Sequence, residues 1–208
     1  GWFNSDKKML REAETALSVK PMSVVDKKQV PPSGDKHDYL SVAPYWWPDS
    51  TKTDGLPYVR RDGERNPDRD LIGDRNRIGD MIKTVNTLAI AYYISGNENY
   101  ANHAAELLRV WFLNPGTRMN PNLNYTQSIR GINEGRGAGI IDTYGFSELV
   151  DAISLLCGSV HWQTHDHAAI VKWFDEYLLW LLTSENGKKE AAAKNNHGTT
   201  YAVQISAI

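Results

Sequence analysis

A run of polar residues near the end of the chain has the side-chain types needed to bind an acidic ligand. The run is Lys194-Asn195-Asn196-His197-Gly198, and it separates two apolar helical patterns at residues 170–182 and 201–208. A helix that begins here would direct unpaired backbone N–H groups outward beside two amides and an imidazole. Such a group can neutralise a carboxylate, and a sugar acid whose carboxylate is neutralised loses the proton of the adjacent carbon more readily. The run therefore indicates elimination on a uronic acid. In the alternative interpretation, Asn195 or Asn196 only caps the helix, and His197 is a solvated neighbour.

A second polar stretch, rich in glycine, covers residues 127–139. Its glycines allow close approach of a backbone, but their spacing does not match the G-x-G-x-x-G phosphate loop, and no predicted strand precedes them. We therefore expect Gln127 and Arg136 to bind substrate, with Glu134 and Asp142 orienting them.

The long segment 21–73 is rich in proline and in aromatic residues. Its aromatic content argues against disorder, so we expect an ordered loop that covers the helices. Pro44 and Pro48 flank Tyr45-Trp46-Trp47 and restrict the backbone there, which favours a preformed aromatic platform for a sugar chain. In the alternative interpretation, these rings only anchor the loop.

Helical periodicity dominates the remainder and predicts an all-α fold. Apolar stripes occur at 10–17, 78–92, 100–111, 146–157 and 170–182, and a further helix begins near Asn196. The short connections predict that 78–92 pairs with 100–111, and that 146–157 pairs with 170–182. Ser95-Gly96 is the expected stop of the stripe at 78–92, and Asn97 and Thr164 are the expected caps of the helices that follow. Residues 184–187 are an expected turn, and no segment shows the alternation of a strand.

The last residues, 201–208, have the pattern of a helix interior without a stop signal. We therefore expect residues 1–208 to be the N-terminal part of one domain that continues further.

Composition excludes several functional classes. The chain has 208 residues, 41% of them hydrophobic, and a net charge of −2, so no basic field marks a nucleic-acid partner. No apolar run is long enough for a membrane span. The single Cys157 lies in an apolar pattern and is expected to be buried. His161, His165 and His167 lack a second ligand pair at helical spacing, so no metal site is predicted, and no cofactor is expected.

Several phrases of the sequence together resemble one known family. They are Lys36-His37-Asp38-Tyr39, residues 43–49 (APYWWPD), residues 54–67, Gly135-Arg136-Gly137 with residues 140–143, and residues 193–198 (AKNNHG). This combination is similar to the alginate-lyase domain, the helical-toroid polysaccharide lyases of families five and thirty-eight, which include glucuronan lyases.

The resemblance implies an (α/α) toroid of antiparallel helix hairpins, incomplete in this chain. It also implies β-elimination of a 1,4-linked polyuronate such as alginate or glucuronan, and a secreted or periplasmic location. By resemblance, Asn196 and His197 act at the uronate carboxylate, and Lys36 corresponds to a lysine of a lid loop. An arginine and a tyrosine of the family's site would lie beyond Ile208.

The candidate substrate-binding residues are Lys36, Tyr45, Trp46, Trp47, Gln127, Arg136, Tyr144 and Tyr201. Two other functions remain open from the sequence. A helical-toroid glycoside hydrolase would need two carboxylates across the scissile bond, for which Glu134, Asp142 and Asp166 are the candidates. A non-catalytic sugar-binding domain would use only the aromatic loop.

Overall fold

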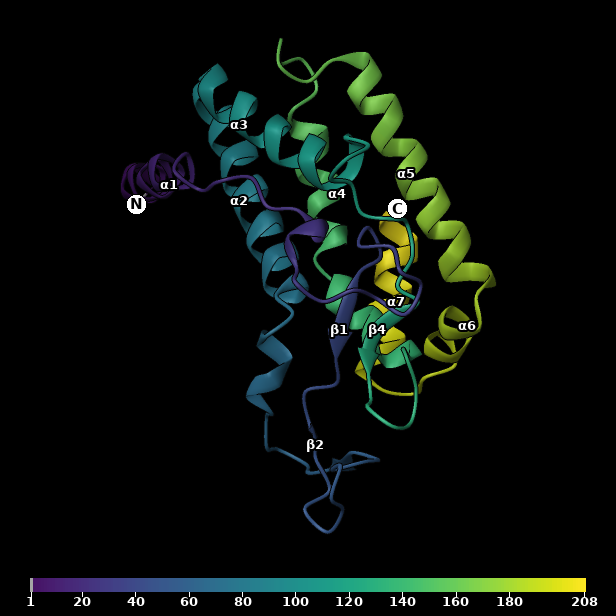
Figure 1. Ribbon diagram of the computed structural model, residues 1–208. Helices are drawn as coiled ribbons and strands as arrows, with labels where there is room; N and C mark the ends of the chain where they lie inside the picture. The colour runs from purple at the N-terminus through teal and green to yellow at the C-terminus, as the bar shows by residue number, and fades with distance from the viewer. Residues whose placement is uncertain (1) are drawn as a thin grey trace.

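Helices make up most of the chain, and β-structure is confined to two short pairs of strands (Figure 1). The computed structural model describes residues 2–208, with side chains from residue 7 onward. Its α-helices are α1 (Trp2–Ala16), α2 (Asp74–Ser95), α3 (Glu98–Leu108), α4 (Phe146–Leu155), α5 (Thr164–Thr183), α6 (Glu185–Ala191) and α7 (Asn196–Ala207). Shorter helical turns are η1 (Val24–Asp26), η2 (Pro67–Asp70), η3 (Arg109–Leu113) and η4 (Gly137–Thr143).

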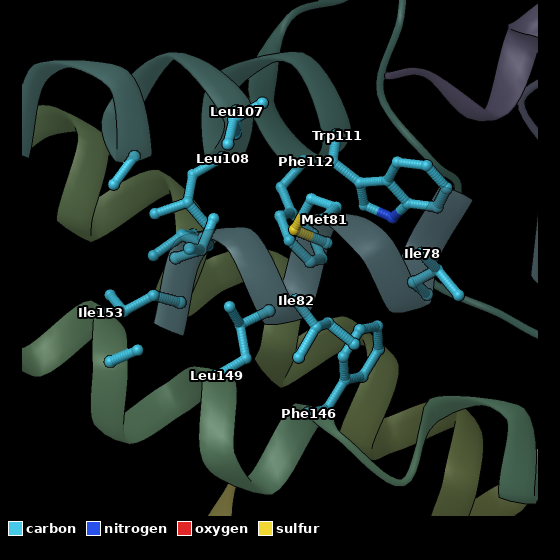
Figure 2. Packing of buried hydrophobic residues seen from close by; sticks show 14 of the residues in the cluster. Ile78, Met81, Ile82, Leu107, Leu108, Trp111, Phe112, Phe146, Leu149 and Ile153 are labelled. Carbon is cyan, nitrogen blue, oxygen red and sulfur yellow. The ribbon is translucent and has the colours of Figure 1, made fainter. Parts of the chain in front are cut away.

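Helix α2 lies between α3 and α4, and its apolar stripe forms the middle of the core. Figure 2 shows Met81 and Ile82 of α2 between Leu108 of α3 and Leu149 of α4. These four side chains are at most 7% exposed. The stripe that the sequence predicted at 78–92 is therefore the one that the two neighbouring helices cover.

The turn between α2 and α3 has the predicted capping residues. Gly96 ends α2 in the left-handed conformation, with φ of 68°, and its N–H donates to the carbonyl of Tyr92. The Asn97 side chain then accepts from the N–H of Asn99 and begins α3. Helices α2 and α3 pack against each other across this turn.

Helix α4 packs mainly against α2 and α7, which differs from the expected pairing of 146–157 with 170–182. It meets α5 through aromatic rings instead. The ring of Phe146 lies 5.5 Å from that of Phe174 and 5.5 Å from that of Tyr177, both edge-to-face. Apolar periodicity identified both helices, but it did not identify which helix would cover which face.

The prediction that the chain has no strands was wrong. Strand β1 (Leu40–Val42) pairs in parallel with β4 (Tyr125–Ser128), and β2 (Trp46–Trp47) pairs antiparallel with β3 (Val59–Arg60). Strands of two to four residues are too short to show the period-two alternation by which a strand is recognised.

The segment 21–73 is ordered, but only its first part covers helices. Val24 and Tyr39 are fully buried in the helical core, whereas residues 44–66 form an arm that projects beyond the helices (Figure 1). The arm is held by its own hydrogen bonds, including Asn66 Nδ2 to the carbonyl of Trp46 and Trp47 Nε1 to the carbonyl of Glu64. The expectation of a covering loop is therefore wrong for residues 44–66.

Three local expectations also need correction. The predicted turn at 184–187 is the first turn of α6, because the Ser184 hydroxyl accepts from the N–H of Gly187. Gln163 rather than Thr164 caps α5. Cys157, two residues beyond the end of α4 at Leu155, is exposed rather than buried.

Candidate active site

The corner between α6 and α7 holds the asparagine and histidine that the sequence singled out. Asn195 is the N-cap of α7, and its side-chain oxygen accepts from the N–H of His197 at 3.1 Å. Asn196 is therefore not the cap, and its side chain is exposed. The His197 side chain is 26% exposed. One helical turn thus presents an amide and an imidazole to a ligand, with the capping role taken by their neighbour.

The imidazole of His197 is held by a carboxylate that the sequence interpretation missed. Nδ1 of His197 lies 2.7 Å from Oε1 of Glu190, a residue of α6 that is only 4% exposed. Burial raises the pKa of Glu190, while the hydrogen bond from His197 and the charge of Arg136 oppose that rise. The sequence signal was weak, because Glu190 follows two lysines between the predicted turn at 184–187 and the polar run at 194–198.

Two glycines allow the close packing that brings these residues together. A Cβ on Gly198 would clash with the carbonyl oxygen of Ala193, so a side chain there would push α7 away from α6. A Cβ on Gly137 would lie 2.6 Å from the carbonyl oxygen of Asn186, where η4 packs on α6. The glycine-rich stretch therefore brings the segment that carries Arg136 against the helix that carries Glu190.

Arg136 is a partly buried cation with unused hydrogen-bonding capacity. One of its terminal nitrogens donates to Oε1 of Gln127 at 2.9 Å. Within the part of the chain that the structure describes, its Nε is buried without a partner. Burial lowers the pKa of Arg136, and the nearby charge of Arg60 lowers it further. The charges of Asp142 and Glu190 oppose this lowering. A carboxylate ligand would supply the missing acceptor for Nε.

Gln127 is buried and holds Arg136, with none of its amide atoms left free for a ligand. It has φ of 45°, a left-handed conformation that costs a residue with a side chain on the order of 1–3 kcal/mol. Its backbone N–H donates to Ser41, and its Nε2 donates to Asp142 at 2.9 Å. The predicted role of Gln127 as a direct substrate ligand is therefore replaced by that of a support for Arg136.

Comparisons with known proteins agree on a single family. The sequence profile of the alginate lyase family matches residues 23–208. The chain belongs to the alginate lyase family. A solved structure of an alginate lyase from Bacteroides ovatus is 50% identical in sequence and superposes with a TM-score of 0.93. The match covers 97% of this chain and 53% of that one, so the chain spans about half the length of that relative. A comparison with curated proteins finds no match.

Two of the other candidate residues of this alginate lyase family member have recorded contacts other than with His197. Lys36 lies in a turn whose backbone is tied to Lys27 and to Asn120, and no hydrogen bond found among residues 2–208 joins that turn to His197. Tyr201 is 5% exposed, and its hydroxyl donates to the carbonyl of Leu181. That placement makes Tyr201 a core residue that links α7 to α5, rather than a residue at a substrate surface.

The remaining candidates lie on two other surfaces. Tyr144 is 61% exposed and lines an open cleft of 580 Å³ together with Asp142, Ile82 and Asn86. Tyr45, Trp46 and Trp47 are half-buried in the arm. The guanidinium of Arg61 lies over the Trp47 ring at 5.3 Å from its centre.

The carboxylates that a glycoside hydrolase would need are already engaged or are exposed. The Asp142 side chain is fully buried and accepts five side-chain hydrogen bonds. Asp166 accepts from Nε of Arg109 at 3.0 Å and from a terminal nitrogen of Arg109 at 2.6 Å, which lowers the pKa of Asp166. Glu134 is exposed. This arrangement disfavours a general acid with a raised pKa opposite a second carboxylate.

Residues 2–208 contain neither a cluster of metal-ligating side chains nor a membrane-spanning helix. No group of three or more metal-ligating side chains is found in that part of the chain. None of the helices described there is long and apolar enough to cross a membrane.

Proposed function

We propose that the protein cleaves a 1,4-linked polyuronate, such as alginate or glucuronan, by β-elimination. The observation that carries the proposal is the exposed Asn196 beside the half-buried His197 in the first turn of α7. A cation near the same corner supports it too, since Gly137, the residue after Arg136, packs against Asn186 and Glu190 of α6. Membership of the alginate lyase family supports the same reaction class.

The chemistry requires that a very weak carbon acid become acidic enough to ionise. A base takes the proton at C5, the C4–O bond breaks, and a C4–C5 double bond forms on the sugar that carries the carboxylate. Negative charge moves onto that carboxylate in the transition state, so hydrogen-bond donors at Asn196 and His197 would stabilise it. One such preorganised donor is worth about 3–4 kcal/mol by analogy with oxyanion holes.

The proposal also includes the complete fold of the domain and the cellular location of the protein. We expect the packed helices to belong to an (α/α) toroid built of helix hairpins, in which the α6–α7 corner borders the substrate cleft. The high TM-score to the alginate lyase from Bacteroides ovatus supports this arrangement. An enzyme that acts on such a polymer is expected to be secreted or periplasmic.

The test is ultraviolet absorbance of the unsaturated product, measured with the protein at its natural length on alginate and on glucuronan. Replacing His197 or Asn196 by Ala should lower kcat by about 10²-fold or more while KM changes little. Matched controls are His165→Ala and Asn99→Ala, which alter exposed residues on α5 and α3.

Three results would contradict the proposal. New reducing ends without ultraviolet absorbance would identify a hydrolase. Binding of polyuronate without any cleavage would identify a sugar-binding domain. Full activity in His197→Ala would remove that residue from the mechanism, whichever polymer is cleaved.

A further inference from the structure

Glu190 is a buried carboxylate whose hydrogen-bond partner is a half-exposed imidazole. Its side chain is 5% exposed, and that of His197 is 26% exposed. The two residues come from adjacent helices, α6 and α7, and the Nδ1–Oε1 distance of 2.7 Å is that of a strong hydrogen bond. In contrast, no hydrogen bond to Nε2 of His197 is found among the residues that the structure describes.

We propose that Glu190 is a positioning residue that holds His197 in the Nδ1–H tautomer and leaves Nε2 as the nitrogen that meets the substrate. This inference rests on the proposed function and adds the group that sets the state of the imidazole. An ionised carboxylate can only accept hydrogen bonds, so the proton between the two residues belongs to Nδ1 of His197.

The ionised form of Glu190 is consistent with its surroundings. Burial is the largest influence and raises the pKa of Glu190, whereas the hydrogen bond from His197, the charge of His197 and the Arg136 cation each oppose that rise and favour the ionised form. The aspartate of the serine-protease triad acts in the same way, since it orients a histidine and selects its tautomer without touching the substrate.

The tautomer determines what His197 can do at the uronate. In the neutral ring with Nδ1–H, Nε2 carries a lone pair and can only accept a proton. In the charged ring, Nε2 carries a hydrogen and can donate to the substrate carboxylate. The Glu190 contact therefore excludes one arrangement, a neutral His197 that donates to the carboxylate through Nε2.

The first test is nitrogen NMR of the protein at its natural length with labelled histidine, at a pH where the rings are neutral. The His197 signal is identified as the one lost in His197→Ala. We expect the Nδ1–H pattern in the wild-type protein. In Glu190→Gln we expect a mixture or the opposite tautomer, because a glutamine amide can donate to Nδ1 as well as accept from it. An Nε2–H pattern in the wild-type protein would overturn the inference.

The second test is kinetic. Glu190→Gln should lower kcat by about 10²-fold or more with little change in KM, in line with the ~10⁴-fold loss when the triad aspartate becomes asparagine. Glu190→Asp, which keeps the charge, should retain more activity than Glu190→Gln. The matched control is Glu185→Gln, an exposed glutamate of the same helix that pairs with Lys188 and not with a histidine.

Failure of this inference can be told apart from failure of the proposed function. If the wild-type protein produces no unsaturated product, the function is wrong, and the NMR measurement still decides whether Glu190 sets the tautomer. If Glu190→Gln does not fold, the inference is tested by the tautomer of His197 in the wild-type protein and by the kcat of Glu190→Asp. Wild-type kcat together with an unchanged tautomer in folded Glu190→Gln would assign Glu190 a purely structural role.

Discussion

Two carboxylates of this protein are almost equally buried but have very different partners. Asp142 accepts five side-chain hydrogen bonds, at Oδ1 from Arg75 and Gln127, and at Oδ2 from Tyr39, Ser41 and Thr126. Glu190 is hydrogen-bonded to one side chain, His197, which remains partly open to solvent. The comparison indicates that a carboxylate saturated by donors from several segments holds a fold together. A carboxylate with one accessible, titratable partner instead prepares that partner for chemistry.

The largest expected effect on stability is at Asp142. In Asp142→Ala, the Arg75 guanidinium and the buried Tyr39 hydroxyl lose their acceptor, so the free energy of unfolding should fall by about 3–5 kcal/mol. Glu190→Gln should lose much less stability, because a glutamine can keep a hydrogen bond to His197. Urea denaturation of both variants measures the difference, with the exposed Asp175→Ala as control. Equal losses at Asp142 and Glu190 would remove the distinction between the two carboxylates.

Asp166 lies between Asp142 and Glu190 in this comparison. Like Glu190 it has one main side-chain partner, Arg109, but that partner is a permanent cation and does not titrate. The two hydrogen bonds from Arg109 lower the pKa of Asp166, so their stabilisation is present above the ordinary aspartate pKa of about 3.9. It is lost as the pH falls through the lowered pKa of the folded state. Asp166→Asn should therefore cost about 1.5–3 kcal/mol at neutral pH, and the difference from wild type should shrink below about pH 4. A difference that is independent of pH would assign the cost to packing instead.

The parts of this fold that the sequence predicted are those whose signal is local. The apolar stripe of α2, the Gly96 stop and the Asn97 cap each depend on residues within a few positions of one another. The pairing of β1 with β4 depends instead on segments more than eighty residues apart. No local pattern could indicate it, and strands of three and four residues carry little pattern of their own.

The candidate site also contains residues with a local sequence signal and residues whose role depends on packing. Asn196 and His197 were recognisable because an amide and an imidazole stood together before an apolar helix. Glu190 was not, because its importance comes from burial and from a contact across the turn between α6 and α7. Tyr201 was misplaced for the converse reason, since its nearness to His197 in sequence does not reveal that its ring points into the core.

A smaller effect is expected at Tyr201. Tyr201→Phe removes one hydroxyl and leaves the carbonyl of Leu181 without that donor, so the free energy of unfolding should fall by about 1 kcal/mol. We expect kcat close to the wild-type value, measured by absorbance of the unsaturated product. A large loss of kcat at unchanged stability would return Tyr201 to the substrate surface and would show that burial alone does not separate structural from catalytic residues here.

The smallest expected effect concerns the arm, where aromatic rings have only other arm residues and a few neighbours as partners. Trp46 is half-buried beside Tyr58 and Arg130, so part of its ring remains available to stack on a sugar. Trp46→Ala should weaken polyuronate binding by about 0.5–1.5 kcal/mol, the scale of one aromatic contact, with a smaller loss in unfolding free energy. Calorimetric titration measures the loss of affinity and urea denaturation measures the loss of stability, with the exposed Tyr93→Ala on α2 as control.

If Trp46→Ala and Trp47→Ala both lower stability while affinity is unchanged, the rings are anchors of the arm. The arm would then belong with Asp142, among the features that hold the fold, and the α6–α7 corner would be the part of this chain left to recognise the polymer.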